Sequence, residues 1–269
     1  MKYFDAHTHP QFVAYDADRD EVMKRALDAG VAMNVVGTQK DTSVAAVALA
    51  EKYDDVYASI GLHPIHTSKS YHDAQELGEG NKEFTSRGEQ LDFDFYKKLG
   101  ENKKVIAIGE CGLDYYRIDE STKDVQFENF VKQIELANQL KKPLMLHIRN
   151  PLRQSGSEAS AYDDAIALIK SHAKVQGDVH FFAGNWDIAK KFLDLGFTLS
   201  FTGVVTFTHD YDDVVKSAPL DMILSETDAP YITPVPHRGK RNESMHIPLV
   251  VERIAEIRGE DAEHVRAQL

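Results

Sequence analysis

Histidine and carboxylate side chains recur in this sequence at the ends of short apolar segments. His7 and His9 follow the segment 2–6 and are separated by a single residue. Because residues i and i+2 of a strand point to the same face, both imidazoles can reach one cation, and Asp5 shares that face. Two partly exposed histidines at a strand end give the same motif, so the pair alone favours a metal site only weakly.

Four further candidate ligands end, lie within or follow comparable apolar segments: Glu110, His147, His180 and Asp228. A carboxylate beside a buried strand is costly unless it is paired or bound to metal. A carboxylate can also bridge two cations, which an imidazole cannot, so we expect Glu110 to be the bridging ligand. Each residue also has an ordinary structural interpretation. Glu110 could be satisfied by backbone amides or Arg117, the two histidines could be hydrogen-bonded core residues, and Asp228 could form a turn before Pro230.

Taken together, the six residues form a donor set for divalent metal ions: His7, His9, Glu110, His147, His180 and Asp228. Imidazole and carboxylate donors suit Zn²⁺, Mn²⁺ or similar ions, and a site with this much carboxylate is compatible with Mg²⁺. His63 ends another apolar segment. We expect it outside the ligand set, where it could contact substrate or metal-bound water.

The fold that brings these residues together is predicted from the alternation of segments. Eight short apolar segments alternate with stretches of helical periodicity such as 122–140. The eight segments are 2–6, 31–37, 56–61, 105–109, 143–148, 178–183, 197–201 and 221–226. A doubly wound open sheet would alternate in the same way, but only a ring of strands lets residues from so many strand ends converge. We therefore predict an α/β protein with a TIM-type (β/α)₈ barrel as a single domain over 1–269, its chemistry at the C-terminal strand ends.

One connection in the predicted barrel is unusually long. Residues 65–91 are polar and follow the third apolar segment, so they must rise from the catalytic face. We hypothesise that they form a lid or shape substrate preference, and a disordered insertion is the alternative.

Composition limits the partners and the compartment. A formal net charge of −12 disfavours a protein that coats nucleic acid by bulk electrostatics. Nucleic acid remains a possible substrate, because bound divalent cations reverse the local field in a cleft. No apolar run approaches the roughly 18 residues of a membrane span, and the first residues do not resemble a signal peptide. Cys111 is the sole cysteine, which favours a reducing compartment. We expect a cytoplasmic monomer without a membrane partner.

A series of motifs, in order over essentially the whole chain, resembles the TatD family of metal-dependent deoxyribonucleases, in the amidohydrolase-type barrel superfamily. The motifs are FDAHTHP, GLHP, IGECGLDYY, PLMLHIR, VHFFAG and ETDAPYITPVPHRGKRNE. IGECGLDYY and ETDAPY are specific to this family. The resemblance implies a two-metal hydrolase that cleaves phosphodiester bonds in DNA, often as a 3′→5′ exonuclease that prefers single strands. Ser244 departs from the family's usual proline, and the 65–91 connection is longer than in typical relatives.

The resemblance also implies roles for individual residues. One metal ion would be held by His7, His9, Glu110 and Asp228. The second would be held by Glu110, His147 and His180. Two such cations lower the pKa of a shared water and clamp the attacked phosphoryl oxygens, with Asp228 as general base. His63 corresponds to the family's active-site histidine outside the main ligand set.

Basic residues would bind the substrate phosphate. Arg238, with Lys240 or Arg241, is expected to grip it, because guanidinium donors can be bidentate. Arg149 is expected to neutralise charge on the scissile group. The alternative for 237–241 is a solvated basic loop.

Two other functions remain open. The same centre could hydrolyse a carboxylic ester, amide or lactone, with aminoacyl-tRNA deacylation as one form. A metal-binding protein without turnover is the other alternative, although an accessible water position beside Asp228 would serve catalysis rather than structure.

Overall fold

The computed structural model describes residues 1–69, 71–72, 84–116, 120–151 and 160–269. Eight parallel strands form one sheet in the order β1-β2-β3-β6-β7-β8-β9-β10. Their bounds are β1 Tyr3–Thr8, β2 Val31–Val36, β3 Val56–Ile60, β6 Val105–Asp114, β7 Leu144–Arg149, β8 Gly177–Val179, β9 Thr198–Phe201 and β10 Ile223–Ser225. The predicted (β/α)₈ barrel is confirmed.

The sheet curves until its first strand meets the chain that follows its last. Thr8 forms a parallel bridge with Ala229. The Asp228 N–H donates to the His7 carbonyl over 2.9 Å, and the His9 N–H donates to the Ala229 carbonyl over 2.8 Å. The barrel is therefore nearly closed at its C-terminal end, where the motifs of β1 and of the segment after β10 adjoin.

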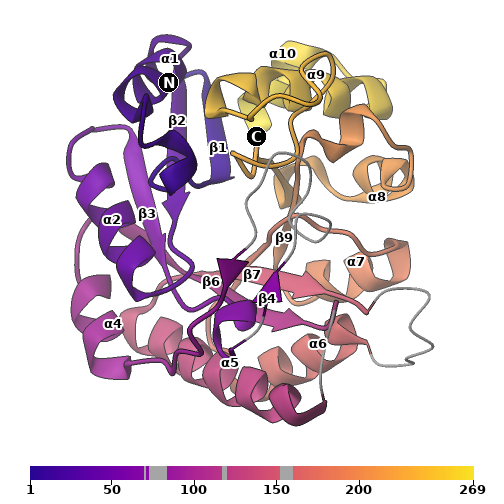
Figure 1. The fold of residues 1–269 in the computed structure, drawn as a ribbon. Helices are drawn as coiled ribbons and strands as arrows, with labels where there is room; N and C mark the ends of the chain where they lie inside the picture. Colours follow the sequence, from indigo (N-terminus) through magenta and orange to yellow (C-terminus); the bar gives the residue numbers. More distant parts are fainter. Residues whose placement is uncertain (70, 73–83, 117–119, 152–159) are drawn as a thin grey trace.

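An outer ring of helices surrounds the strands (Figure 1). The helices are α1 Arg19–Asp28, α2 Lys40–Ala50, α4 Phe93–Gly100, α5 Glu120–Leu140, α6 Ala161–His172, α7 Trp186–Leu193, α8 Asp212–Ser217, α9 Ile247–Arg258 and α10 Ala262–Gln268. Short 3₁₀ turns are η1 Val13–Tyr15, η2 Pro64–His66, η3 Gly203–Thr206, η4 Leu220–Met222 and η5 Ser244–His246. The helix predicted over 122–140 corresponds to α5, which buries Phe130, Ile134 and Ala137. Among the described helices, none is long and apolar enough to cross a bilayer.

Strand β6 extends further than its sequence predicts. The expected strand ended at Gly109, whereas the observed strand continues to Asp114 because β7 pairs with it up to Arg149. The intervening glycine, Gly112, adopts φ +141° where an added Cβ would lie 2.1 Å from the His147 carbonyl oxygen. A glycine there permits close approach of the two strands. Glu110 consequently lies within a strand rather than after it.

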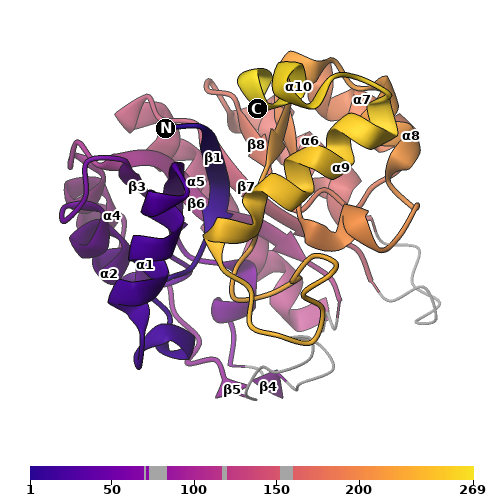
Figure 2. The same cartoon turned by 90° about the horizontal axis from the view of Figure 1, so that it is seen from above.

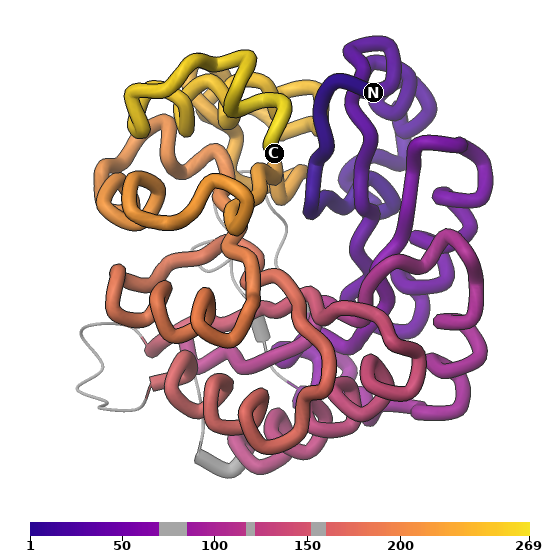
Figure 3. Tube along the Cα trace, turned by 180° about the vertical axis from the view of Figure 1, so that it is seen from behind, coloured from indigo at the N-terminus to yellow at the C-terminus, as the bar shows by residue number. Residues whose placement is uncertain are grey.

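The loops at the C-terminal strand ends gather on one side of the barrel, and both chain termini lie on the other (Figure 2). The termini lie side by side (Figure 3), where Arg266 donates to the Lys2 carbonyl over 3.1 Å. In the 65–91 connection, β4 (Tyr71–His72) pairs antiparallel with β5 (Phe84–Thr85) on the loop side. Residues 70 and 73–83 lie outside the described residues, so the lid hypothesis stays a prediction.

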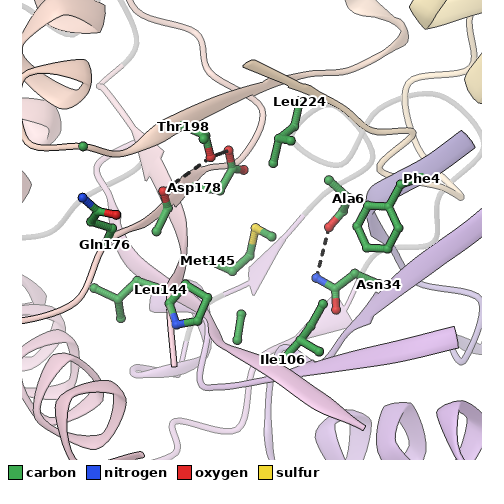
Figure 4. Close-up of a pocket in the computed structure, with 14 residues that line it drawn as sticks. Phe4, Ala6, Asn34, Ile106, Leu144, Met145, Gln176, Asp178, Thr198 and Leu224 are labelled. Carbon is green, nitrogen blue, oxygen red and sulfur yellow. Dashed lines mark hydrogen bonds between the residues drawn. The ribbon is translucent and has the colours of Figure 1, made fainter. Parts of the chain in front are cut away.

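A pocket opens inside the barrel at the N-terminal strand ends (Figure 4). Its lining includes Phe4, Asn34, Met145, Asp178 and Thr198, drawn from strands around the ring. Phe4, Met145 and Asp178 each precede a candidate ligand along the chain, namely His7, His147 and His180, so the pocket lies at the opposite end of the barrel from the loops.

Candidate metal centre

The two histidines of β1 meet a carboxylate of β6 at the C-terminal end of the barrel. His7 Nε2 lies 3.1 Å from His9 Nε2. Glu110 Oε2 lies 3.5 Å from His7 Nε2 and 4.0 Å from His9 Nε2. All three side chains are buried. Nitrogen and oxygen donors therefore converge on one point, as ligands of a single ion do.

The other oxygen of Glu110 faces a second group of histidines. Glu110 Oε1 lies 3.0 Å from His147 Nδ1, 3.2 Å from His63 Nε2 and 3.6 Å from His180 Nε2. Its backbone N–H donates to the Gly37 carbonyl over 3.0 Å, which fixes the residue against β2. Glu110 thus lies between two sets of imidazoles, the arrangement expected of a carboxylate shared by two ions.

Asp228 completes the first group from the opposite edge of the sheet. Its Oδ1 lies 3.4 Å from His9 Nε2, and donor atoms of His7, His180 and Asp228 lie within 4.8 Å of one another. Asp228 has φ +52°, an uncommon conformation for a residue with a side chain. The hydrogen bond of its N–H to His7 holds it there, so barrel closure positions this carboxylate.

His63 presents a proton rather than a lone pair to this centre. Its Nδ1 accepts a hydrogen bond from the Ile65 N–H over 3.1 Å. A neutral imidazole carries one N–H, so the proton must be on Nε2, which then donates to Glu110. In this tautomer His63 donates a hydrogen bond to Glu110, although donor atoms of His63, Glu110 and His147 also lie within 4.8 Å of one another, close enough to hold one ion.

Two candidate ligand histidines, His147 and His9, have a hydrogen-bond acceptor on the other ring nitrogen, and a third, His180, has a carboxylate oxygen at ion-pair distance there. His180 Nδ1 lies 2.9 Å from Glu226 Oε1, and His147 Nε2 lies 2.9 Å from Asp114 Oδ2. His9 Nδ1 lies 2.7 Å from the Val36 carbonyl oxygen. Metal-binding histidines commonly use their second nitrogen in this way, because the acceptor fixes the ring and raises its basicity.

Glu226 and Asp114 were not predicted from the sequence. Glu226 stands two residues before Asp228, and Asp114 stands four residues after Glu110. Even spacing within a strand places side chains on one face, as for Glu110 and Asp114 in β6, whereas Glu226 and Asp228 follow the end of β10 and share only the sequence spacing. That parity was the signal from which both supporting carboxylates could have been inferred.

The electrostatics of the centre favour a cation. Burial alone would raise the pKa of Glu110, but His63 and His7 hold it well below the usual range. Burial also raises the pKa of Asp114, but the hydrogen bond from His147 outweighs it and lowers that pKa to about 2. The pKa of Asp228 is lowered as well, despite burial, by the bond to His9. Three ionised carboxylates in a buried site need compensating positive charge, which protonated histidines beside them supply here and which bound divalent ions would supply equally.

The imidazoles of the centre differ in basicity. Burial and the neighbouring His180 lower the pKa of His7, and burial lowers that of His63 to about 4. His7 Nδ1 has no hydrogen-bond partner among the described residues. Burial acts downward on the other two rings as well, but Asp114 and Glu110 raise the pKa of His147, and Glu226 raises that of His180 to about 10. Metal ions at these carboxylates would therefore release the protons of His147 and His180, as metal binding to imidazole does, so the residues present fit such ions.

The predicted phosphate-binding residues lie on the rim of the barrel. The Arg149 guanidinium stacks 3.6 Å from the Tyr116 ring centroid, and that of Arg238 lies 4.0 Å from the Phe207 ring centroid. Lys240 is exposed in the same loop as Arg238.

The Arg241 guanidinium is engaged in hydrogen bonds within the protein. It donates to both carboxylate oxygens of Asp18, over 2.8 and 2.6 Å, and to the Ala14 carbonyl over 2.7 Å. These bonds join the loops after β1 and β10. Its partners lie more than 220 residues away in the chain, so sequence spacing could not reveal this role.

Comparison with known proteins agrees with this architecture. A family model described as TatD related DNase matches residues 4–269. The uncharacterized metal-dependent hydrolase YabD of Bacillus subtilis is 37% identical over 260 residues, covering 95% of this chain and 91% of that protein. The 3′-5′ ssDNA/RNA exonuclease TatD of Shigella flexneri is 31% identical over 270 residues, covering 96% of this chain and 92% of that protein.

Solved structures share the fold. The crystal structure of YjjV, a TatD homologue from Escherichia coli, superposes with a TM-score of 0.79 at 26% sequence identity. The alignment covers 100% of this chain and 95% of that one.

Proposed function

Because the chain belongs to the TatD-related DNase family, we propose that this metal-dependent hydrolase cleaves phosphodiester bonds in single-stranded DNA from the 3′ end. The position of Glu110 between two groups of histidines, under a rim that carries exposed cations, is the observation that carries the proposal. The relative named as a 3′-5′ ssDNA/RNA exonuclease supports it.

We assign two divalent ions, Zn²⁺, Mn²⁺ or Mg²⁺, to the two sides of Glu110. The first set of ligands is His7, His9, Glu110 and Asp228. The second is Glu110, His147 and His180. Bound there, such ions supply Lewis acidity toward phosphoryl oxygens and lower the pKa of water.

The protein's own residues supply the remaining chemistry. Asp228 is ionised at neutral pH, because its pKa is lowered, and it can accept the proton of the attacking water. His63 donates to Glu110 and keeps that carboxylate oriented. On the rim, Arg238 and Lys240 bind the phosphate, and Arg149 offsets charge that develops on the scissile group. Arg241 instead positions the loop that carries them.

The nearest alternative is hydrolysis of a carboxylic ester or amide, including aminoacyl-tRNA deacylation. The same centre could perform it. A small neutral ester or amide would not need the cations of the rim, so those cations favour a substrate with a phosphate backbone, and the cleavage assay below separates a phosphodiester from the ester of an aminoacyl-tRNA.

The test is turnover of 5′-labelled single-stranded DNA by protein stripped with chelator and reconstituted with Mg²⁺, Mn²⁺ or Zn²⁺. We expect a shortening ladder that requires metal and disappears in Glu110→Ala. Glu128→Ala is the matched control, because Glu128 is an exposed carboxylate on α5 that pairs only with Lys132 among the described residues. Absence of cleavage with every metal, despite metal uptake, would move the substrate to the ester or amide class.

A further inference from the structure

Apolar side chains are exposed at one sector of the catalytic face. Within the residues that the structure describes, the exposed large apolar side chains are Met1, Val13, Val44, Phe207 and Val235. Val13, Phe207 and Val235 follow the C-terminal ends of β1, β9 and β10, strands that are consecutive around the barrel. Single exposed apolar residues need no explanation, but Phe207 and Val235 lie on loops that a hydrogen bond joins, and an aromatic residue among them indicates a contact surface.

Phe207 is the aromatic member of this group and is paired with a cation. Its side chain is 43% exposed, and the Arg238 guanidinium lies 4.0 Å from its ring centroid. The one hydrogen bond that the described residues give Arg238 goes to the Thr233 carbonyl over 2.9 Å. The other guanidinium donors remain for a ligand.

The two loops that carry the pair are fixed to each other. The Val235 N–H donates to Thr206 Oγ1 over 3.0 Å. A Cβ added at Gly203 would lie 2.4 Å from the Ile232 carbonyl oxygen, so η3 and the loop after β10 touch through their backbones. Phe207 and Arg238 therefore form a preorganised surface rather than two independent mobile side chains.

The same loop connects this surface to the metal centre. It begins at Asp228, passes Tyr231, whose ring centroid lies 6.3 Å from that of His9, and reaches Arg238 and Lys240. A ligand that extends from the centre along this loop meets the Phe207 ring and two cations.

We propose that Phe207 and Arg238 form a platform for one nucleotide of the single-stranded substrate beside the scissile bond. The inference rests on the proposed nuclease function. The exposed part of the Phe207 ring stacks on an unpaired base, and Arg238 contacts the adjoining phosphate. Aromatic stacking accepts any base, whereas guanidinium bonding follows the backbone. A duplex keeps its bases stacked on one another, so this platform favours single strands.

Charge favours a nucleotide over a protein partner at this surface. The chain has a net charge of −12, and the segment after Phe207 carries Asp210, Asp212 and Asp213, yet the group that lies against the Phe207 ring is the Arg238 guanidinium, and Lys240 is exposed in the loop that carries Arg238. A local positive region on an acidic protein attracts a polyanion. The phosphates on either side of a stacked base would meet these two side chains.

The experiment compares Phe207→Ala and Phe207→Trp with the wild type, using 5′-labelled oligothymidylate and the same oligomer with abasic residues near its 3′ end. For Phe207→Ala we expect KM for the oligothymidylate to rise about 5- to 150-fold, the range expected when stacking on one base is lost. The increase in KM for the abasic oligomer should be much smaller, because that oligomer has no base to stack on residue 207. Phe207→Trp should restore the wild-type KM.

The control is Val44→Ala, which removes a side chain of similar exposure, 45%, from α2 on the outside of the barrel. Val44→Ala should leave the KM for both oligomers unchanged. An unchanged KM in Phe207→Ala, an equal increase on both oligomers, or a changed oligomeric state in size-exclusion chromatography would each overturn the platform. If the wild-type protein neither binds nor cleaves the oligomers, the nuclease proposal fails as well. If the wild type cleaves the oligomers and the KM of Phe207→Ala is unchanged, the platform proposal fails and the nuclease proposal stands.

Discussion

Substitution of Gly112 tests how closely β6 and β7 approach at the metal centre. Gly112 pairs with His147, and it separates Glu110 from the supporting carboxylate Asp114. Its φ of +141° disfavours any other residue, and an alanine Cβ would lie 2.1 Å from the His147 carbonyl oxygen. That oxygen belongs to the backbone of a neighbouring strand, so one of the two strands must move.

The expected loss of stability combines two effects. A positive φ costs a residue with a side chain about 1–2 kcal/mol, and overpacking costs about 1–3 kcal/mol. Gly112→Ala should therefore lower the free energy of unfolding by about 2–5 kcal/mol, out of the about 5–15 kcal/mol of a typical protein. Because the displaced strand carries His147, metal affinity should fall in the same variant.

The control separates strain from packing. Gly259 ends α9 with φ +66°, and nothing lies within 4 Å of the position of an added Cβ. Gly259→Ala should cost only the conformational part, about 1–2 kcal/mol. Urea unfolding of the metal-free proteins measures both losses. Equal losses would refute the close approach of the two strands, and with it the register that brings His147 to Glu110.

Three further outcomes follow from contacts of the centre and its loops. Glu226→Gln keeps the shape of the side chain but removes the carboxylate beside His180. Metal affinity, measured by competition with a chelator, should therefore fall about 10- to 100-fold. An unchanged metal affinity would contradict the supporting role of Glu226. Asp114 has a pKa of about 2 when folded against 3.8 ordinarily. Its stabilisation is therefore present above pH 3.8 and lost as the pH falls toward 2, by roughly 2 kcal/mol. Acid unfolding should show this loss in the wild type, and Asp114→Asn should remove that part of the pH dependence. Arg241→Ala should lower the free energy of unfolding by about 1 kcal/mol. Arg241→Lys should not restore that stability, because an ammonium cannot replace the bidentate pair with Asp18. Full recovery of the stability in Arg241→Lys would argue against the bidentate geometry.

Periodicity and the order of polar residues sufficed to predict the barrel. Apolar strand segments such as 31–37 are short, β-branched and buried on both faces, so the sequence pattern follows directly from the structure. The end of β6 was not predictable, because the glycines that usually stop a strand here allow β7 to approach. Strand pairing is a tertiary property that a local pattern does not contain.

The metal-centre residues were predictable to different degrees. The residues that the structure gathers around Glu110 stand at strand ends, where spacing and barrel topology together limit their positions. Glu226 was detectable in principle from its even spacing to Asp228. The Asp18 pairing of Arg241 and the Phe207 stacking of Arg238 join segments that are distant in sequence, and no local signal marks them.

The central claim is that Glu110 is shared by two metal ions. Anomalous diffraction from crystals of the protein loaded with Zn²⁺ or Mn²⁺ tests it most directly. We expect two peaks, one on the side of Glu110 that faces His7 and His9 and one on the side that faces His147 and His180. A single peak, or a peak that Glu110 does not contact, would contradict it.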